Sequence, residues 1–224
     1  MVQVGDKTLR QVCHETISHF KVEGKWHHVP IVETCTFDEN DKVLICHEYQ
    51  KSLMLTTLKS SPFASFDKPK TNTDVDNNNG SVAKDSSKGS TLIEISKQIK
   101  KKLFEDRDVA AACQFLTDDV SYELVPYESK TVGREHILKS FSTFADWIQD
   151  GRFELVTAFE STTQDGDLTV RKVCMERISH FKAEDKWFSV PVCDIMTFNQ
   201  EDKVTSWREY HTLDYLAEVK NPPF

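Results

Sequence analysis

Residues 174–191 read CMERISHFKAEDKWFSVP, and residues 13–30 read CHETISHFKVEGKWHHVP. When the chain is displaced by 161 residues, positions 1–63 align with positions 162–224 without a gap, and 29 of these 63 residues are identical. Such self-similarity is the signature of an internal repeat. The sequence therefore predicts that residues 1–63 are a partial duplicate of the C-terminal end of the chain.

The repeated unit predicts three β-strands. The runs 169–181, 186–198 and 202–211 are rich in Val, Ile, Thr and aromatic residues, and polar turn residues separate them. Short connections of this kind join antiparallel neighbours, so the pattern predicts a meander. A short helix is expected after the third strand, over 213–219.

The region before this unit, residues 91–161, has no counterpart in the first copy. Apolar residues at helical spacing predict helices over 92–103, 109–116 and 133–149. Strand-like runs occupy 120–128 and 153–161. Helices therefore precede a sheet, which indicates the α+β class.

The segment 64–90 differs from both of its neighbours. Ser, Asn, Asp, Lys and Gly dominate it, and such a composition buries too little apolar surface to offset the entropy of ordering. The expected organisation is a partial copy over 1–63, a disordered linker over 64–90, and a complete domain over 91–224.

Composition excludes several classes of protein. The net charge is −8, and no Lys/Arg stripe with interleaved aromatic residues occurs, which argues against a nucleic-acid partner. No apolar run is long enough to span a membrane, and the N-terminus lacks an apolar signal segment. The one basic run, KQIKKK at 97–102, is expected on the solvated face of a helix.

The six cysteines show no CxxC spacing and favour reduced thiols in a cytoplasmic protein. No clustered Cys or His residues indicate a metal site. No glycine-rich loop indicates a phosphate-bearing group, so no cofactor is expected.

Several motifs carry a resemblance to a known family. DDVSYELVP at 118–126, VGREHI at 132–137, ERIS at 176–179, VPV at 190–192 and MTF followed by DKVTSWREY at 196–210 resemble the limonene-epoxide-hydrolase and SnoaL-like branch of the nuclear transport factor 2-like superfamily. The resemblance covers essentially all of 91–224 and its second half again in 1–63. It implies an α+β fold in which a cone-shaped, curved antiparallel sheet packs on N-terminal helices, preceded here by a partial three-strand copy.

The resemblance also implies site residues. In the epoxide hydrolases an Arg and two Asp activate a water and protonate the epoxide, with help from a Tyr and an Asn. The Arg matches Arg177, the second Asp matches Glu209, and the Tyr matches Tyr122. Ser179 stands where the first Asp is expected, and Leu124 stands where the Asn is expected. The chain thus lacks part of the arrangement that positions the water.

Strand alternation extends this set, because residues two apart share a face of a sheet. A face that contains Arg177 predicts one apolar cavity with a few polar groups, which suits a small, mostly apolar ligand. The candidate catalytic residues are Arg177, Glu209 and His211. The candidate ligand contacts are Tyr122, Ser179, Val190, Val192, Asp194, Met196 and Trp207.

Each titratable candidate has two interpretations. Arg177 with Glu209 is either part of a functional site or a buried ion pair that joins neighbouring strands. His211 is either a general base or a backbone-bonded residue at the cavity mouth. Asp194 is either a polar anchor, including an acid of raised pKa, or a bulge residue that faces solvent. Tyr122 is either a catalytic acid or a core aromatic residue.

The first copy lacks the helices that would close a cavity. Thr16 replaces Arg177, and Gln50 replaces His211. Residues 1–63 are therefore expected to be structural. Members of the superfamily often dimerise through the outer face of the sheet, so the copy is expected to dock on that face, in the same chain or in a homodimer. The alternative is that the chain is part of a tandem-domain protein.

Three functions remain open at this point. The first is a SnoaL-like protein that binds a small apolar ligand without catalysis. The second is an enzyme of the hydrolase or isomerase type that acts on an epoxide or carbonyl compound, with Glu209 or His211 as base. The third is a dimerisation or interaction domain whose cavity is filled by its own Phe and Met side chains. An open cavity favours the first two.

Overall fold

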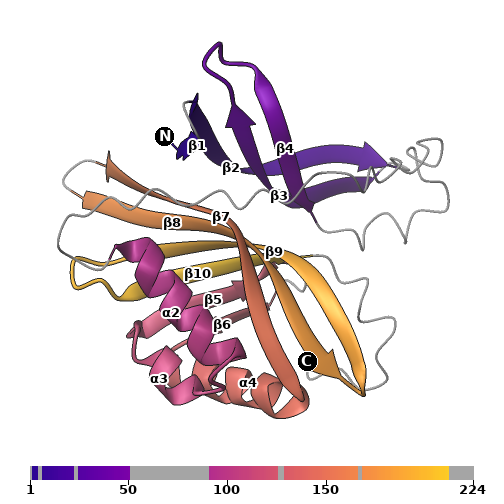
Figure 1. Ribbon diagram of the computed structural model, residues 1–224, viewed down its shortest axis with the longest axis vertical. Helices are drawn as coiled ribbons and strands as arrows, with labels where there is room; N and C mark the ends of the chain where they lie inside the picture. The colour runs from indigo at the N-terminus through magenta and orange to yellow at the C-terminus, as the bar shows by residue number, and fades with distance from the viewer. Residues whose placement is uncertain are drawn as a thin grey trace.

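The computed structural model describes residues 2–4, 7–22, 25–50, 91–125, 129–165 and 168–211 (Figure 1). The expected linker 64–90 and the expected helix 213–219 lie outside the described residues. Among the described residues, none of the helices has the length and hydrophobicity that a membrane span requires.

The N-terminal part forms one antiparallel sheet. Its strands are β1 (Val2–Val4), β2 (Lys7–Val22), β3 (Lys25–Phe37) and β4 (Val43–Gln50), in the order β1-β2-β3-β4. The three long strands are those that the repeat predicts.

The C-terminal part begins with helices. They are α2 (Leu92–Phe104) and α3 (Val109–Cys113), and then β5 (Leu116–Leu124), β6 (Ser129–Val132) and α4 (Arg134–Trp147) follow. The chain ends in four strands, β7 (Asp150–Asp165), β8 (Leu168–Ala183), β9 (Lys186–Phe198) and β10 (Val204–His211). The predicted α+β fold, with helices before a sheet, is confirmed.

Local sequence explains where the helices begin. The Thr91 hydroxyl accepts a hydrogen bond from the Glu94 backbone N–H at 3.2 Å and caps α2, and Asp108 caps α3 in the same way through Ala111. The helix α4 starts after Gly133, whose φ of 97° is a conformation that side-chain-bearing residues rarely adopt.

The six C-terminal strands form one sheet in the order β6-β5-β10-β9-β8-β7. The four strands β7 to β10 are antiparallel neighbours, as predicted, whereas β5 pairs with β10 in parallel. The sheet is therefore mixed. The short strand β6, which pairs with β5, was not anticipated because four residues carry too little periodicity to be recognised.

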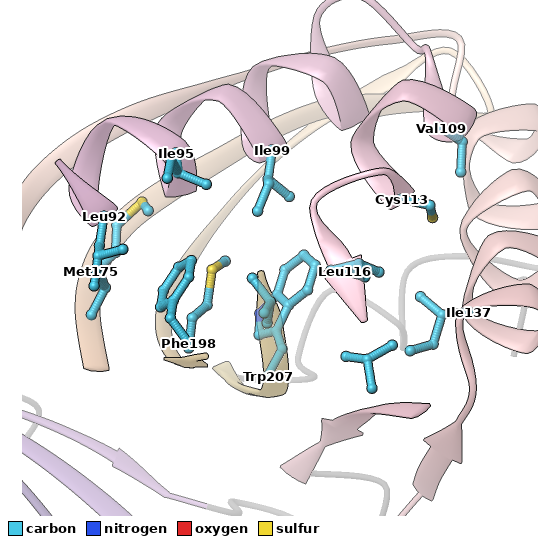
Figure 2. Packing of buried hydrophobic residues seen from close by; sticks show 14 of the residues in the cluster. Leu92, Ile95, Ile99, Val109, Cys113, Leu116, Ile137, Met175, Phe198 and Trp207 are labelled. Carbon is cyan, nitrogen blue, oxygen red and sulfur yellow. The ribbon is translucent and has the colours of Figure 1, made fainter. Parts of the chain in front are cut away.

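Two layers cover this sheet (Figure 1). The helices lie on one face, here called the inner face, and the N-terminal strands lie over the opposite, outer face. On the inner face Leu92, Ile95 and Ile99 of α2 pack towards Met175 and Phe198 of the sheet, in one buried cluster (Figure 2). This helix-on-sheet packing fixes the position of the cavity described below.

The two similar segments pair in the same register. Glu15 lies opposite Val32 in the N-terminal sheet, and Glu176 lies opposite Cys193 in the C-terminal sheet, each residue 161 positions further on. The pairing of β3 with β4 shifts its register next to Phe37, and the pairing of β9 with β10 shifts at the equivalent residue, Phe198. The local structure of the two segments is therefore the same, although helices cover only one of them among the described residues.

We predict that Gly133→Ala lowers the free energy of unfolding by about 1–3 kcal/mol, because the residue would keep a positive φ at the start of α4. Urea unfolding followed by circular dichroism measures the change. The control is Glu135→Ala in the first turn of the same helix, which should stay within about 0.5 kcal/mol of wild type. Equal stabilities for the two variants would contradict the assigned backbone conformation.

Candidate functional site

A cavity of about 350 Å³ lies between α2, α4 and the inner face of the sheet. Most of its wall is apolar. Tyr122, Phe141 and Trp207 meet edge to face, with ring centroids 5.0 to 5.4 Å apart, and form one side. Phe181 and Phe144 line the cavity as well. The cavity is open, so the expectation that its own side chains fill it is not met.

The predicted site residues divide into two groups. Seven of them line the cavity: Tyr122, Ser179, Val190, Val192, Trp207, Glu209 and His211. Three do not: Arg177 and Asp194 are buried beside it, and Met196 belongs to the hydrophobic core. Strand alternation placed the residues of the last three strands on the inner face, and the family resemblance added Tyr122. Neither tells which positions along the strands meet open space.

Four charged side chains meet at the base of the cavity. Arg177 Nε donates to Asp194 Oδ2 at 2.6 Å, and Arg177 Nη2 lies 3.1 Å from Glu209 Oε1. Lys100 Nζ donates to Asp194 Oδ1 at 2.7 Å and lies 3.5 Å from Glu209 Oε2. Two cations and two carboxylates therefore form one network, which we call the buried charge network.

Lys100 is the member that sequence reasoning missed. The interpretation of the 97–102 run as a solvated surface is wrong for this residue, because its side chain is fully buried. Its ammonium group lies 3.8 Å from the centroid of the Trp207 ring. Its position was a signal, because it lies eight residues after Leu92 and three before Leu103, and residues at these spacings share one face of a helix.

The environment of Lys100 changes its acidity. Burial disfavours the charged amine, and the neighbouring Arg177 cation adds to this, so the pKa of Lys100 is lowered. The contacts with Asp194 and Glu209 act in the opposite direction without reversing the shift.

Asp194 is the central acceptor of the network. Besides Arg177 and Lys100, the Trp207 indole Nε1 donates to its Oδ1 at 2.8 Å. Burial alone would raise the pKa of Asp194, but Arg177 and Lys100 outweigh it and lower the pKa to about 2. The alternatives of a solvent-facing bulge residue and of an acid of raised pKa are both wrong, because Asp194 is fully buried and its pKa is lowered.

Lys100 and Glu209 are the members of the network that line the cavity, and of the four only Glu209 has a partly exposed side chain. Its side chain is 14% exposed, whereas those of Lys100, Arg177 and Asp194 are fully buried. The Tyr122 hydroxyl donates to Glu209 Oε2 at 3.4 Å, and burial together with this carboxylate raises the pKa of Tyr122 well above its ordinary value. A protonated phenol and a carboxylate thus stand side by side at the cavity wall.

Two further polar groups complete this end of the site. The Ser179 hydroxyl accepts a hydrogen bond from Arg177 Nη1, so its own proton is available to another acceptor. His211 lines the cavity and is buried. Further from the network, Thr131, Lys139 and Thr143 add polar atoms to the lining. Within the described residues, no group of three His, Cys, Asp or Glu side chains could hold a metal ion.

The comparisons with known proteins concern the C-terminal part of the chain. The family model of the SnoaL-like domain matches residues 101–207. No curated protein matches the chain in sequence.

Solved structures with a similar fold include three bacterial proteins. A hypothetical protein with a ketosteroid isomerase-like fold from Catenulispora acidiphila is 19% identical, with 58% of this chain and 95% of that chain covered and a TM-score of 0.47. An epoxide hydrolase like limonene-epoxide hydrolase from M. tuberculosis is 18% identical (54% and 81% covered, TM-score 0.42). A SnoaL-like polyketide cyclase, so described provisionally, from Shewanella putrefaciens is 14% identical (60% and 88% covered, TM-score 0.46). Similarities this low carry no information about the chemistry of the site.

We predict that Arg177→Met lowers the free energy of unfolding by about 3–5 kcal/mol, because Asp194 and Glu209 would lose a buried partner. Chemical denaturation measures the loss. The control is Lys101→Met, which breaks an exposed pair with Asp106 and should leave the free energy of unfolding close to that of wild type. If the two variants were equally stable, the network would not be a stabilising element.

Lys100 should give the chain a characteristic dependence on pH. Its pKa is lower in the folded chain than in the unfolded chain, so between these two values the unfolded chain binds more protons and stability rises with pH. We therefore expect the free energy of unfolding of wild type to increase as the pH is raised from the lowered pKa of Lys100 to the ordinary pKa of lysine. The variant Lys100→Met should lack this increase. Lys130→Met, at an exposed position, should keep the wild-type slope. An unchanged slope in Lys100→Met would contradict the assignment.

Proposed function

We propose that the C-terminal part of the chain, of which residues 101–207 match the family model of the SnoaL-like domain, binds a small, mostly apolar ligand in its cavity. The observation that carries the proposal is the open cavity of about 350 Å³, in whose described lining Glu209 is the one carboxylate. Ligand pockets of proteins are concave, apolar and furnished with a few polar groups, and they typically measure about 300–1,000 Å³. The volume here supports a ligand at the small end of that range.

The polar groups define the part of the ligand that they would bind. Glu209 accepts hydrogen bonds, and its other partners are Arg177 and Lys100 of the network and the Tyr122 hydroxyl. A ligand group that donates a hydrogen bond, such as a hydroxyl, therefore suits this end of the cavity. The apolar body of the ligand would contact the Tyr122, Phe141 and Trp207 rings and the Val190 side chain.

A second candidate function is catalysis on a small apolar epoxide or carbonyl compound, of the hydrolase or isomerase type. The observation that favours it is the adjacent pair of Glu209 and Tyr122 at the cavity wall. Glu209 would take a proton from the substrate or from an attacking water, and the Tyr122 hydroxyl would donate one. Ser179 stands where the resemblance predicts the first Asp, yet Arg177 still contacts two carboxylates. One belongs to Glu209, and the other belongs to Asp194 of the neighbouring strand.

The role of Arg177 in such a reaction would be indirect. Its side chain is fully buried and does not line the cavity, so it would orient Glu209 and would not touch the substrate. His211 lines the cavity and is the alternative base. Ligand binding and catalysis would use the same pocket, so only a measurement of turnover distinguishes the two functions.

We predict that a panel of small apolar alcohols, epoxides and enones contains compounds that raise the melting temperature of wild type and leave that of Val190→Phe unchanged. The Phe side chain would occupy the cavity that Val190 lines. The control is Val156→Phe, at a position that is 50% exposed, which makes the same change in size away from the cavity and should retain the shift. A compound that shifts wild type and both variants equally would bind elsewhere.

Turnover of the compounds that bind decides between the two functions. If the site is catalytic, Glu209→Gln should lower kcat by about 100-fold or more, because an amide cannot act as a general base. Tyr122→Phe and His211→Asn then identify the acid and the alternative base. Binding without turnover in wild type would leave the chain as a ligand-binding protein. No binding to wild type over the whole panel would argue against both functions.

A further inference from the structure

Two of the six cysteines stand directly opposite each other on neighbouring strands. All six lie within the described residues and are free thiols. In the antiparallel pairing of β3 with β4, Cys35 is the partner of Cys46. Side chains of directly opposite residues point to the same face of a sheet, and the Cys35 thiol hydrogen-bonds to Cys46. The two side chains therefore form an adjacent pair of thiols.

The separation of opposite residues suits a disulfide bond. Directly opposite Cα atoms of antiparallel strands lie about 4.5–5.5 Å apart. Disulfides span Cα separations of about 4.4–6.8 Å. A bond between Cys35 and Cys46 therefore needs rotation of the two side chains and no movement of the strands.

The same criterion excludes the other cysteines. The sulfur atoms of Cys174 and Cys193 lie 3.6 Å apart, but Cys174 is opposite Ile195, so the two cysteines are diagonal neighbours. Diagonal Cα atoms are about 7–8 Å apart, too far for a disulfide without backbone movement. Cys13 belongs to the facing sheet, and stacked sheets lie about 10 Å apart. Cys113 lies in the main buried cluster, in which the structure describes no other cysteine.

The pair of Cys35 and Cys46 is accessible to small reagents. Cys46 is exposed, and Cys35 is partly buried. Their counterparts 161 positions further on are Met196 and Trp207, which are also opposite each other but are buried in one cluster with residues of α2. Among the described residues the helices cover only the C-terminal sheet (Figure 1). The N-terminal segment thus carries two thiols at an open position where the C-terminal domain carries core residues.

Exposure sets the order in which the two thiols would react. Cys46 is the one that a dissolved reagent meets first. Burial, followed by the hydrogen bond to Cys46 and its charge, raises the pKa of Cys35 to about 11. Cys35 therefore stays protonated as long as Cys46 is unmodified. A bond from Cys46 to another sulfur removes the charge of Cys46 and with it that contribution.

We propose that Cys35 and Cys46 are a redox-active dithiol, which low-molecular-weight disulfides such as glutathione disulfide oxidise to an intramolecular bond. The Cys46 thiolate attacks one sulfur of the reagent, a mixed disulfide forms, and a glutathione thiolate leaves. The Cys35 thiolate then attacks the Cys46 sulfur and displaces the second glutathione thiolate. The protons of both protein thiols pass to the leaving thiolates. One glutathione disulfide is thus reduced to two glutathione molecules while the pair is oxidised.

The position of the pair connects it to the contact between the two sheets. The next opposite residues on the same strands are Thr34 and His47, whose side chains point to the other face. Both bind one carboxylate of the C-terminal sheet: the Thr34 hydroxyl donates to Glu176 Oε1, and His47 Nδ1 lies 3.0 Å from the same oxygen. A bond between Cys35 and Cys46 fixes β3 to β4 beside this contact. Oxidation therefore stabilises the attachment of the N-terminal strands.

Disulfide mapping of the full chain tests the proposal. Wild type is equilibrated in buffers with graded ratios of reduced to oxidised glutathione, quenched with acid, alkylated and digested with trypsin, which cuts after Lys42 between the two cysteines. We expect mass spectrometry to find a peptide that joins Cys35 to Cys46, removable by dithiothreitol, with the remaining cysteines alkylated. A wild-type chain that stays reduced, that keeps glutathione on Cys46, or that links another pair overturns the proposal.

Single variants test the order of the two steps. Cys35→Ser lacks the second step, so glutathione should remain on Cys46 as the main product, whereas it is a minor product in wild type. Cys46→Ser should take up much less glutathione, because Cys35 is partly buried. The control is Cys13→Ser, which makes the same change at another partly buried position of the N-terminal sheet and should keep the bond. Equal glutathione uptake by Cys35→Ser and Cys46→Ser would contradict the assigned order.

Hydrogen exchange tests the effect of oxidation on the contact. The strand β2 is not one of the linked strands, and it should exchange its amides more slowly in oxidised than in reduced wild type, because the N-terminal sheet detaches less often. The variant Cys46→Ser, in the same two buffers, should show no difference. Equal exchange of β2 in both forms of wild type would overturn the link between the dithiol and the contact.

Discussion

The C-terminal domain depends on the balance of four buried charges. Burying one ion without a partner costs several kcal/mol, so Lys100, Arg177, Asp194 and Glu209 are stable inside the fold only as a neutral set. Lys100 comes from α2, and the other three come from β8, β9 and β10. The network therefore ties the helix to three strands in one register, and a slip of any element by one residue would leave a charge unpaired.

The same network divides the inner face into two regions. On one side the strands carry Met175, Met196 and Trp207 of the main core, and on the other side they carry Phe181 and Val190. The core side is filled, whereas the far side opens into the cavity, and Glu209 stands at the boundary. A carboxylate at the edge of a buried network is firmly oriented by the network and still accessible to a ligand, which is the arrangement that binding sites need.

The sequence predicted the strands and the faces of their residues well, because alternation along a strand is a local property. It did not predict Lys100 as a site residue, because a run of four lysines in six residues resembles a solvated helix face and only the crossing of α2 over the sheet buries one of them. Likewise, the parallel pairing of β5 with β10 joins segments that are distant in sequence, which no local pattern reveals. The role of Asp194 was left open for the same reason, since its partners lie on α2, β8 and β10.

The two faces of the repeated strands obey different constraints, and this explains what the N-terminal segment retains. Its inner face keeps the carboxylates Glu33 and Glu48, which lie opposite each other, but Thr16 replaces the arginine, and among the described residues no lysine-bearing helix covers it. Glu33 lies 3.7 Å from a histidine, His14, and Glu48 is exposed, so the described part of this face does not reproduce the buried charge network. Its outer face keeps Cys13, Glu15 and Tyr49, each identical to the residue 161 positions further on, and the Glu15 and Tyr49 side chains hydrogen-bond to the C-terminal sheet. The N-terminal segment has therefore lost the charged residues of its inner face but still contacts the C-terminal sheet through its outer face.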